Sequence, residues 1–195
     1  MFRQLRPAIT MVIAITVLTG FIYPFVITGI AQTLFPKQAN GSLIRWNGHI
    51  VGSKLIGQNF TGPMWFHPRP SAAGNGYNAT QSGGSNLGPT NRALIDRIKQ
   101  STEQYRKENG LPPGAPIPAD AVTESASGLD PDISPANADL QATRIAKARG
   151  LPSATVNRLI AQHTQQRTLG FLGEPRVNVL ELNLELARVA INKRR

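Results

Sequence analysis

The chain has 195 residues, with 21 Lys and Arg against 11 Asp and Glu, a formal net charge of +10, and no cysteine. The absence of cysteine excludes disulfide bonds and thiolate metal sites. The basic side chains are scattered and no aromatic residues alternate with them, which argues against a surface that binds nucleic acid. The excess positive charge instead suits anionic lipid headgroups or an acidic protein surface.

A long uncharged stretch lies close to the amino terminus. Residues 7–36 contain no Asp, Glu, Lys, Arg or His. About 20 apolar residues cross a hydrocarbon core roughly 30 Å thick, so we predict a transmembrane helix over residues 8–34. A cleaved secretory signal is the alternative, because Arg3 and Arg6 precede the stretch and Gly29-Ile30-Ala31 resembles a cleavage site. The apolar regions of such signals are only about 7–15 residues long, which favours an anchor.

The charges that flank this stretch predict its orientation. Two arginines and the amino terminus precede it, whereas the first residues beyond it carry only Lys37 and Arg45. The positive-inside rule therefore predicts that residues 1–7 are cytoplasmic and that residues 35–195 lie outside. Without the two amino-terminal arginines, the exterior part has a formal charge of +8.

The predicted span contains no ionisable side chain that could relay protons or coordinate an ion, and one helix alone forms no conduction path. Thr16, Gly20, Pro24 and Thr28 recur every four residues. Small residues with this spacing let membrane helices approach each other closely, so these four predict a packing ridge. The other interpretation is that Gly, Pro and Thr are simply common in membrane helices.

The part that follows predicts a hairpin and then a long loop. Residues 42–46 and 49–51 flank Asn47-Gly48, a dipeptide that accepts the positive φ of a tight turn, which predicts a β-hairpin. Residues 61–89 are rich in Gly, Pro, Asn and Ser. So long a loop is uncommon in a compact domain and is usually functional or disordered.

Capping and stop residues then indicate helices. The first helix is predicted to begin at Thr90 or Asn91 and to stop at Asn109-Gly110. The second begins with Ser134 as its cap and Pro135 at its first position, and it ends before Gly150. Both helices therefore have a residue that can hydrogen-bond to the first backbone N–H groups and a glycine that can end the helix.

The carboxyl-terminal part continues the helical pattern. Apolar residues show helical spacing over 156–163. The last element has alternate leucines that suit a strand, but we predict a helix because Asn178 and Glu181 form a plausible capping pair. The segments between helices are predicted as a linker over 112–118 and an extended stretch over 119–129. The sequence thus predicts an α+β protein with one transmembrane helix and one exterior domain, whose hairpin and glycine-rich loop occupy 41–89 and whose mainly helical part occupies 90–195.

Residues with catalytic or metal-binding chemistry are few. His49, His67 and His163 lie far apart, without the paired spacing of a zinc site, and are predicted to be structural. The Gly-x-Ser-x-Gly and Ser-x-x-Lys signatures of serine hydrolases do not occur. From its residues the sequence therefore predicts no catalytic group, no metal site and no cofactor bound by a motif of its own.

Two short motifs allow two interpretations each. Asp130 and Asp132 are candidate cation-facing acids, although such pairs more often form turns and place negative charge before a helix. The glycines in residues 82–85, Ser-Gly-Gly-Ser, could present backbone N–H groups to a phosphate, but no Gly-Lys-Ser/Thr follows and Gly-Gly is more often a turn.

An ordered series of short motifs over nearly the whole chain resembles the C subunit of the Kdp-type potassium-transporting P-type ATPase of bacteria. Each motif is weak alone, and together, in this order, they are specific. The motifs are Tyr23-Pro24, Gly41-Ser42-Leu43-Ile44, Gly52-Ser53, Leu55-Ile56-Gly57-Gln58-Asn59-Phe60, Phe66-His67, Arg69-Pro70-Ser71, Tyr77-Asn78, Ser82-Gly83-Gly84-Ser85-Asn86-Leu87, Ser125-Ala126-Ser127-Gly128-Leu129-Asp130, Ala146-Lys147-Ala148-Arg149, Val177-Asn178 and Leu182-Asn183-Leu184.

The resemblance implies a non-catalytic accessory subunit of the bacterial inner membrane. Its implied partners are a channel-like subunit that binds potassium and a P-type ATPase subunit that hydrolyses ATP, so ATP and potassium belong to the complex. The family is described as a catalytic chaperone that raises the ATP affinity of the pump subunit. If residues 35–195 are outside, such an effect has to cross the membrane as conformational coupling, and no nucleotide-binding residue is identified.

The exterior domain is also expected to lie over the potassium entrance, where it steadies the channel-like subunit or screens access. An anchored exterior enzyme or solute-binding module that acts alone is the alternative function. The residues expected to contact partners are Gln58, Asn59, Phe60, His67, Arg69, Ser82, Gly83, Gly84, Ser85 and Asn86.

Overall fold

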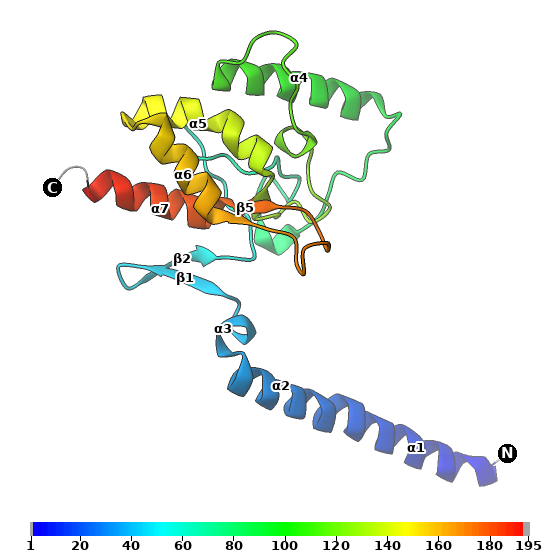
Figure 1. Ribbon diagram of the computed structural model, residues 1–195. Coiled ribbons are helices and arrows are strands. Elements are labelled where there is room, and N and C mark those ends of the chain that lie inside the picture. Colours follow the sequence, from blue (N-terminus) through cyan, green and yellow to red (C-terminus); the bar gives the residue numbers. More distant parts are fainter. Residues whose placement is uncertain (1, 193–195) are drawn as a thin grey trace. The chain divides into compact units, whose positions relative to one another are not determined.

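The computed structural model describes the backbone of residues 2–192 and divides the chain into two compact units, Met1–Ser53 and Lys54–Arg195 (Figure 1). The first unit contains the long amino-terminal helix and a β-hairpin, and the second contains helices packed around a small sheet. This composition confirms the predicted α+β class.

The amino-terminal helix is continuous from Leu5 to Leu34, so the helix predicted over residues 8–34 is confirmed. It follows a 3₁₀ turn, η1 (Phe2–Gln4), and consists of α1 (Leu5–Val17), a π-helical turn η2 (Leu18–Ile22) and α2 (Tyr23–Leu34). The helix is long and apolar enough to cross a membrane, and none of its side chains is buried within the protein.

Pro24 explains why a π turn interrupts this helix. Proline has no backbone N–H to donate to the carbonyl four residues earlier, which is that of Gly20, and its ring would collide with that carbonyl. Here the N–H of Tyr23 donates to the carbonyl of Leu18, a bond that spans five residues. The wider turn gives the proline ring the space that it needs.

The π turn also changes how the predicted ridge runs along the helix. In a regular α-helix, residues four apart drift sideways by about 40° at each step, since one turn takes 3.6 residues. A π turn winds more slowly and offsets part of this drift. Thr16, Gly20, Pro24 and Thr28 therefore lie more nearly in one line than a regular helix would place them.

The hairpin of the first unit follows the short helix α3 (Pro36–Ala39). Strand β1 (Leu43–Trp46) pairs antiparallel with β2 (His49–Ser53), and a bulge lies between Ile44 and Arg45. Asn47 and Gly48 have φ values of 48° and 83° in the turn. The predicted hairpin and its turn are therefore confirmed.

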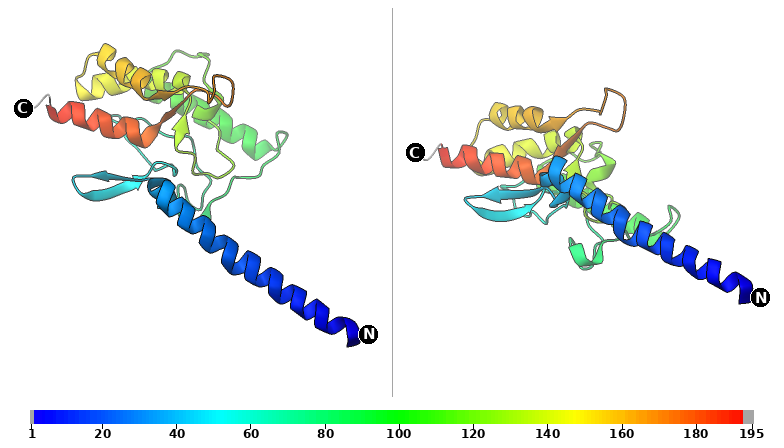
Figure 2. Two further views of the ribbon diagram at one scale, coloured as in Figure 1. Left: turned by 60° about the horizontal axis from the view of Figure 1, so that its bottom comes forward. Right: turned by 90° about the horizontal axis from the view of Figure 1, so that it is seen from below.

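In the second unit three helices pack around a three-stranded antiparallel sheet, as the two views of Figure 2 show. The helices are α5 (Pro135–Arg149), α6 (Ser153–His163) and α7 (Val179–Asn192), and the strands, in the order β3-β5-β4, are β3 (Asp132–Ile133), β5 (Arg176–Asn178) and β4 (Thr164–Gln165). The largest apolar side chains buried between them are Phe66, Ile133, Ile145, Val156, Val177, Leu182 and Leu186.

The remaining long helix, α4 (Arg92–Asn109), contributes to a second and smaller apolar cluster. Buried Tyr105 of α4 packs there with Ala121 and Val122. The side chain of Asn91 accepts a hydrogen bond from the backbone N–H of Ala93, and the helix ends at Gly110 with φ of 65°. Of the two predicted starts, Thr90 and Asn91, Asn91 is therefore the cap.

The caps of the last two predicted helix starts are also confirmed. Ser134 accepts a hydrogen bond from the backbone N–H of Asn137 at the start of α5, which ends at Gly150 with φ of 60°. At the start of α7, the side chain of Asn178 accepts from the backbone N–H of Glu181 at 3.1 Å. The last element is a helix, despite its alternate leucines.

The prediction of an extended stretch over residues 119–129 is wrong. The segment begins as a 3₁₀ turn, η4 (Ala119–Ala121), and continues as bends and turns. A turn brings Ala121 and Val122 together against α4, where both are buried, whereas an extended chain would point them to opposite sides. The predicted loop over 61–89 is irregular apart from the 3₁₀ turn η3 (Ala79–Gln81).

Candidate functional site

A stretch of extended backbone at Phe66 and His67 passes between α5 and α7 without pairing to a strand. Asn183 of α7 accepts from the N–H of Phe66 at 2.9 Å and donates to its carbonyl at 3.0 Å. Gln141 of α5 does the same for His67, at 2.7 and 3.1 Å. Two buried side-chain amides therefore replace a neighbouring strand and satisfy four backbone groups in the core.

The amide of Gln141 continues into a buried network beneath α4. It donates to Asn137 Oδ1 at 2.9 Å, and the hydroxyl of Tyr105 donates to the same oxygen at 2.7 Å. Asn137 Nδ2 donates in turn to Asp120 Oδ2 at 3.0 Å. Burial raises the pKa of the Tyr105 hydroxyl well above its ordinary value, so it stays a donor at any physiological pH. The network ties α4 and η4 to α5.

Three of the predicted contact residues, Asn59, Phe60 and His67, line one cavity of about 480 Å³ together with Tyr105 and Glu108. The Nε2 atom of His67 lies 2.8 Å from the carbonyl oxygen of Gly62, and its Nδ1 atom lies 3.7 Å from Glu108.

Burial lowers the pKa of His67 below its ordinary value of 6.5, more than the hydrogen bond to Gly62 and the charge of Glu108 raise it. The ring is therefore neutral at pH 7 and donates its Nε2–H to the carbonyl of Gly62.

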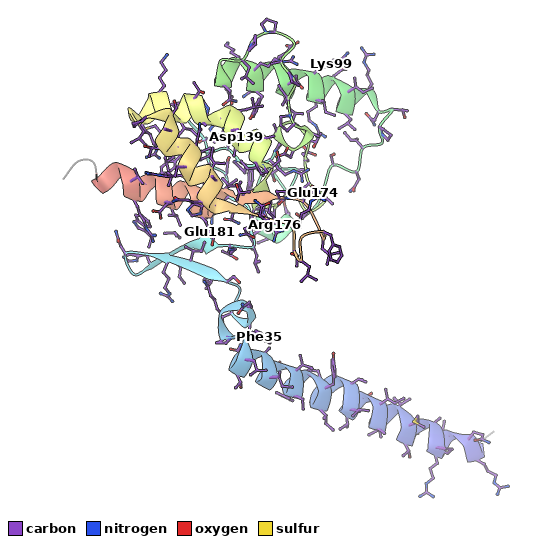
Figure 3. All side chains as sticks on the ribbon, in the orientation of Figure 1. Phe35, Lys99, Asp139, Glu174, Arg176 and Glu181 are labelled. Atoms are coloured by element: carbon purple, nitrogen blue, oxygen red, sulfur yellow. The ribbon has the colours of Figure 1, made fainter. Side chains whose placement is uncertain are left out.

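A second cavity, of about 540 Å³, is lined by Arg69 and by both candidate cation-facing acids, Asp130 and Asp132. Arg69 Nη1 lies 2.9 Å from Asp130 Oδ2, and Arg176 Nε lies 3.0 Å from Asp132 Oδ2. Glu174 also lines this cavity, and Figure 3 shows it beside Arg176 on the segment that leads into β5.

The acids of this cavity are already engaged with other groups. Asp130 Oδ1 accepts from the backbone N–H of Asp132 at 3.0 Å, which forms the turn that the sequence offered as the alternative interpretation. Burial holds the pKa of Asp132 above its ordinary value, although the hydrogen bond from Asn178 and the charge of Arg176 act in the opposite direction. In the part of the chain that the structure describes, no group of three or more His, Asp or Glu residues is arranged to hold a metal ion.

The glycine-rich motif at residues 82–86 packs along the segment 125–128. Gly83 N–H and Ser82 Oγ both donate to the carbonyl of Ser127 at 2.9 Å. A Cβ at Gly84 would lie 3.1 Å from the carbonyl oxygen of Ala126. The N–H of Gly83, which could have bound a phosphate, thus donates to a carbonyl of the protein itself. Ser85 accepts a hydrogen bond from Arg97 at 3.1 Å.

Ser71 and Gly57, which were not among the predicted site residues, join the remaining motif segments. Ser71 Oγ donates to the carbonyl of Gly128 at 2.6 Å and accepts from the N–H of Tyr77 at 2.8 Å. Gly57, which precedes Gln58, donates to the carbonyl of Leu129 at 2.8 Å. The structure therefore brings the motifs around residues 57, 71, 83 and 128 into one cluster of interlocked loops.

Sequence reasoning also missed the two amides that hold the extended segment. Asn and Gln are usually exposed, so neither type alone predicts a buried clamp. Their positions in the sequence could have indicated burial. Gln141 lies among Ala138, Ala142 and Ile145 on the apolar face of α5, and Asn183 lies next to buried Leu182 on α7.

The chain thus combines one helix able to cross a membrane with a separate α+β unit whose motif residues mainly bind one another. In the second unit, irregular loops pack against helices and are held by hydrogen bonds between the motif segments.

The family described as "K+-transporting ATPase, c chain" matches residues 5–188. Proteins named Potassium-transporting ATPase KdpC subunit are similar to this chain over nearly their whole length. The one from Gemmatimonas aurantiaca is 59% identical over 95% of this chain and 93% of its own. Those from Koribacter versatilis and Mycobacterium tuberculosis are each 54% identical, over 95% and 97% of this chain and 95% and 100% of their own. The chain belongs to the KdpC family of potassium-transporting ATPase subunits.

Proposed function

We propose that this protein is a non-catalytic accessory subunit that assembles and stabilises a potassium-uptake ATPase. Its partners in this proposal are the channel-like subunit that binds potassium and the P-type subunit that hydrolyses ATP. The observation that carries the proposal is the family match from residue 5 to residue 188, which includes both the apolar helix and the α+β unit. The family match therefore includes both units, and the matching proteins are named as a subunit of a potassium-transporting ATPase.

The use of the motif residues supports an accessory role. Arg69, Ser71 and Gly83 spend their hydrogen bonds on neighbouring loops of the same unit. A set of loops fixed in this way presents a rigid surface, which lowers the entropy lost when a partner binds. Such a unit is suited to holding partners in position.

In this proposal the helix Leu5–Leu34 crosses the inner membrane once, with the amino terminus in the cytoplasm and the α+β unit in the periplasm. The charge asymmetry around the apolar stretch supports this orientation. An effect on ATP affinity then has to act through a conformational equilibrium of the pump subunit, to the extent that this chain binds one conformation more tightly than the other. ATP and potassium are bound by the complex.

The partner surface in this proposal includes the two cavities and two loop segments of the second unit. Asn59, Phe60 and His67 line the first cavity, and Arg69 lines the second. Gln58 and residues 82–86 complete the proposed surface. The paired acids Asp130 and Asp132 offset part of the basic charge where the unit lies over the potassium entrance.

The proposal is tested by copurification. The chain carries an affinity tag after Arg195, and membranes from cells that depend on this ATPase for potassium are dissolved in a mild detergent. Two much larger membrane proteins should copurify, and excess untagged chain should reduce their recovery. Recovery of the tagged chain alone would reject the accessory role and favour an anchored enzyme or solute-binding module that works by itself.

A further inference from the structure

The hairpin that joins β4 to β5 ends in an exposed apolar tip. Leu169, Phe171 and Leu172 are 79%, 68% and 50% exposed. Leu169 and Phe171 are the two most exposed large apolar side chains among the described residues of the second unit. Figure 1 shows this hairpin projecting away from the helices that follow and precede it. Large apolar side chains gathered at one exposed point mark an interaction site more often than isolated ones do.

The backbone of the tip makes this exposure more informative. Leu169 has a φ of 55° and Gly170 a φ of 82°, and the N–H of Phe171 donates to the carbonyl of Thr168 at 3.3 Å. Positive φ at both central residues of a β-turn favours Asn or Gly, not leucine. Leu169 therefore has two unfavourable features, a strained backbone conformation and an apolar side chain exposed to water. Neither feature stabilises the fold of this unit.

The tip is held rigidly despite its exposure. Thr168 and Leu172 exchange two backbone hydrogen bonds, each of 2.9 Å. Below them, Arg167 Nη2 lies 2.6 Å from Glu174 Oε2 across the hairpin. One arm then continues into β5, whose Val177 is fully buried in the core. Apolar side chains that are already held in place lose little entropy on binding, which favours their use as contacts to a partner.

We propose that the apolar tip inserts into an apolar pocket on another subunit of the same ATPase, and this inference rests on the accessory role proposed above. The charges beside the tip favour a protein over the lipid surface. Arg167 and Glu174 neutralise each other, and the Glu174 side chain is 78% exposed next to the apolar residues. Binding of a hairpin to an anionic bilayer is strengthened by an excess of basic side chains beside its apolar tip, and the paired Arg167 and Glu174 provide no such excess.

The replacement L169N tests the inference because it separates stability from binding. Asparagine suits the positive φ at this position, so the purified full-length chain should melt at the same temperature as the wild type or higher. The double replacement L169N/F171S should reduce copurification of the partner subunits about tenfold or more, as expected when anchor residues are removed. M64N, which changes another exposed apolar residue of the second unit, is the matched control and should leave copurification unchanged.

A photo-crosslinking residue at position 172 of the intact complex identifies what the tip touches. The expected product is an adduct with one partner subunit, lost when partner and chain are separated by denaturant before irradiation. An adduct with lipid, an adduct with a second copy of this chain, or wild-type copurification by L169N/F171S would each overturn the inference. If no partner copurifies with the wild-type chain, the proposed function is rejected, and not only the role of the tip.

Discussion

Gly128 shows how one residue can hold several loops together. Its φ is 67°, and a Cβ placed on it would lie 2.6 Å from the carbonyl oxygen of Gly83 and 2.7 Å from the backbone N of Ala73. Both neighbours are backbone atoms, which cannot move aside as the end of a flexible side chain can. Glycine is required here by its conformation and by the space available.

G128A should therefore lower the free energy of unfolding by about 3 kcal/mol or more, since it adds a backbone clash to the strain of positive φ. The matched control is G150A, because Gly150 has a similar φ of 60° with nothing within 4 Å of its Cβ position. G150A should cost only about 1 kcal/mol. Urea unfolding of both full-length variants in detergent measures the two losses, and equal losses would show that the loop packing at Gly128 contributes nothing.

At the scale of the element, the amino-terminal helix combines a regular spacing with an irregular turn. The four-residue recurrence from Thr16 to Thr28 predicts a ridge, and the π turn over Leu18–Ile22 brings that ridge closer to a straight line. A straight line of small residues is a surface along which a second membrane helix can approach closely.

P24A should supply the backbone N–H that proline lacks, relax the π turn into a regular α-helix and rotate Thr28 away from Thr16. The chain has no cysteine of its own, so single cysteines placed at positions 16 and 28 report contacts directly. In the wild type both positions should crosslink to the same partner helix, and in P24A one of them should lose at least half of its product. P7A is the control, because Pro7 lies in the first turn of α1, where a backbone N–H has no partner within the helix. Unchanged crosslinks in P24A would mean that the ridge does not depend on the π turn.

At the scale of the whole molecule, one unit contains the apolar helix and the β-hairpin, and the other is a basic α+β unit. A long apolar helix followed by a polar unit suits a tethered exterior domain. In the proposal the positive charges before the span stay in the cytoplasm, so nearly all of the polar chain lies on the periplasmic side of the membrane. The same asymmetry also fits a cleaved signal, which would leave a shorter, unanchored chain.

Protease added to sealed spheroplasts should remove the second unit and leave a protected fragment that contains the apolar helix. The measured mass of the untreated chain should equal that of all 195 residues. A mass equal to that of a chain starting near residue 32 would establish cleavage of a signal instead. R3Q/R6Q is the informative variant, because loss of the two amino-terminal charges should leave part of the population protected. Complete protection of the wild-type chain would contradict the periplasmic placement.

Features set by neighbouring residues could be predicted from the sequence by itself. The length of the apolar helix, the Asn47-Gly48 turn and the caps at Asn91, Ser134 and Asn178 all depend on interactions within a few positions along the chain. Their partners are fixed by local geometry, so the residue type and its spacing are sufficient. The ordered motifs likewise identified the family over nearly the full chain.

Only the tertiary structure decided what the polar motif residues do. Asn183 meets Phe66 across 117 positions of the chain and Gln141 meets His67 across 74, distances over which sequence spacing carries no information. The three short strands, the turn at residues 119–121 and the exposure of Leu169 depend in the same way on which distant segments need burial or a hydrogen-bond partner. Local propensity fixed the helices and the Asn47-Gly48 turn, and the burial of apolar side chains and polar backbone groups fixed the strands and the arrangement within the second unit.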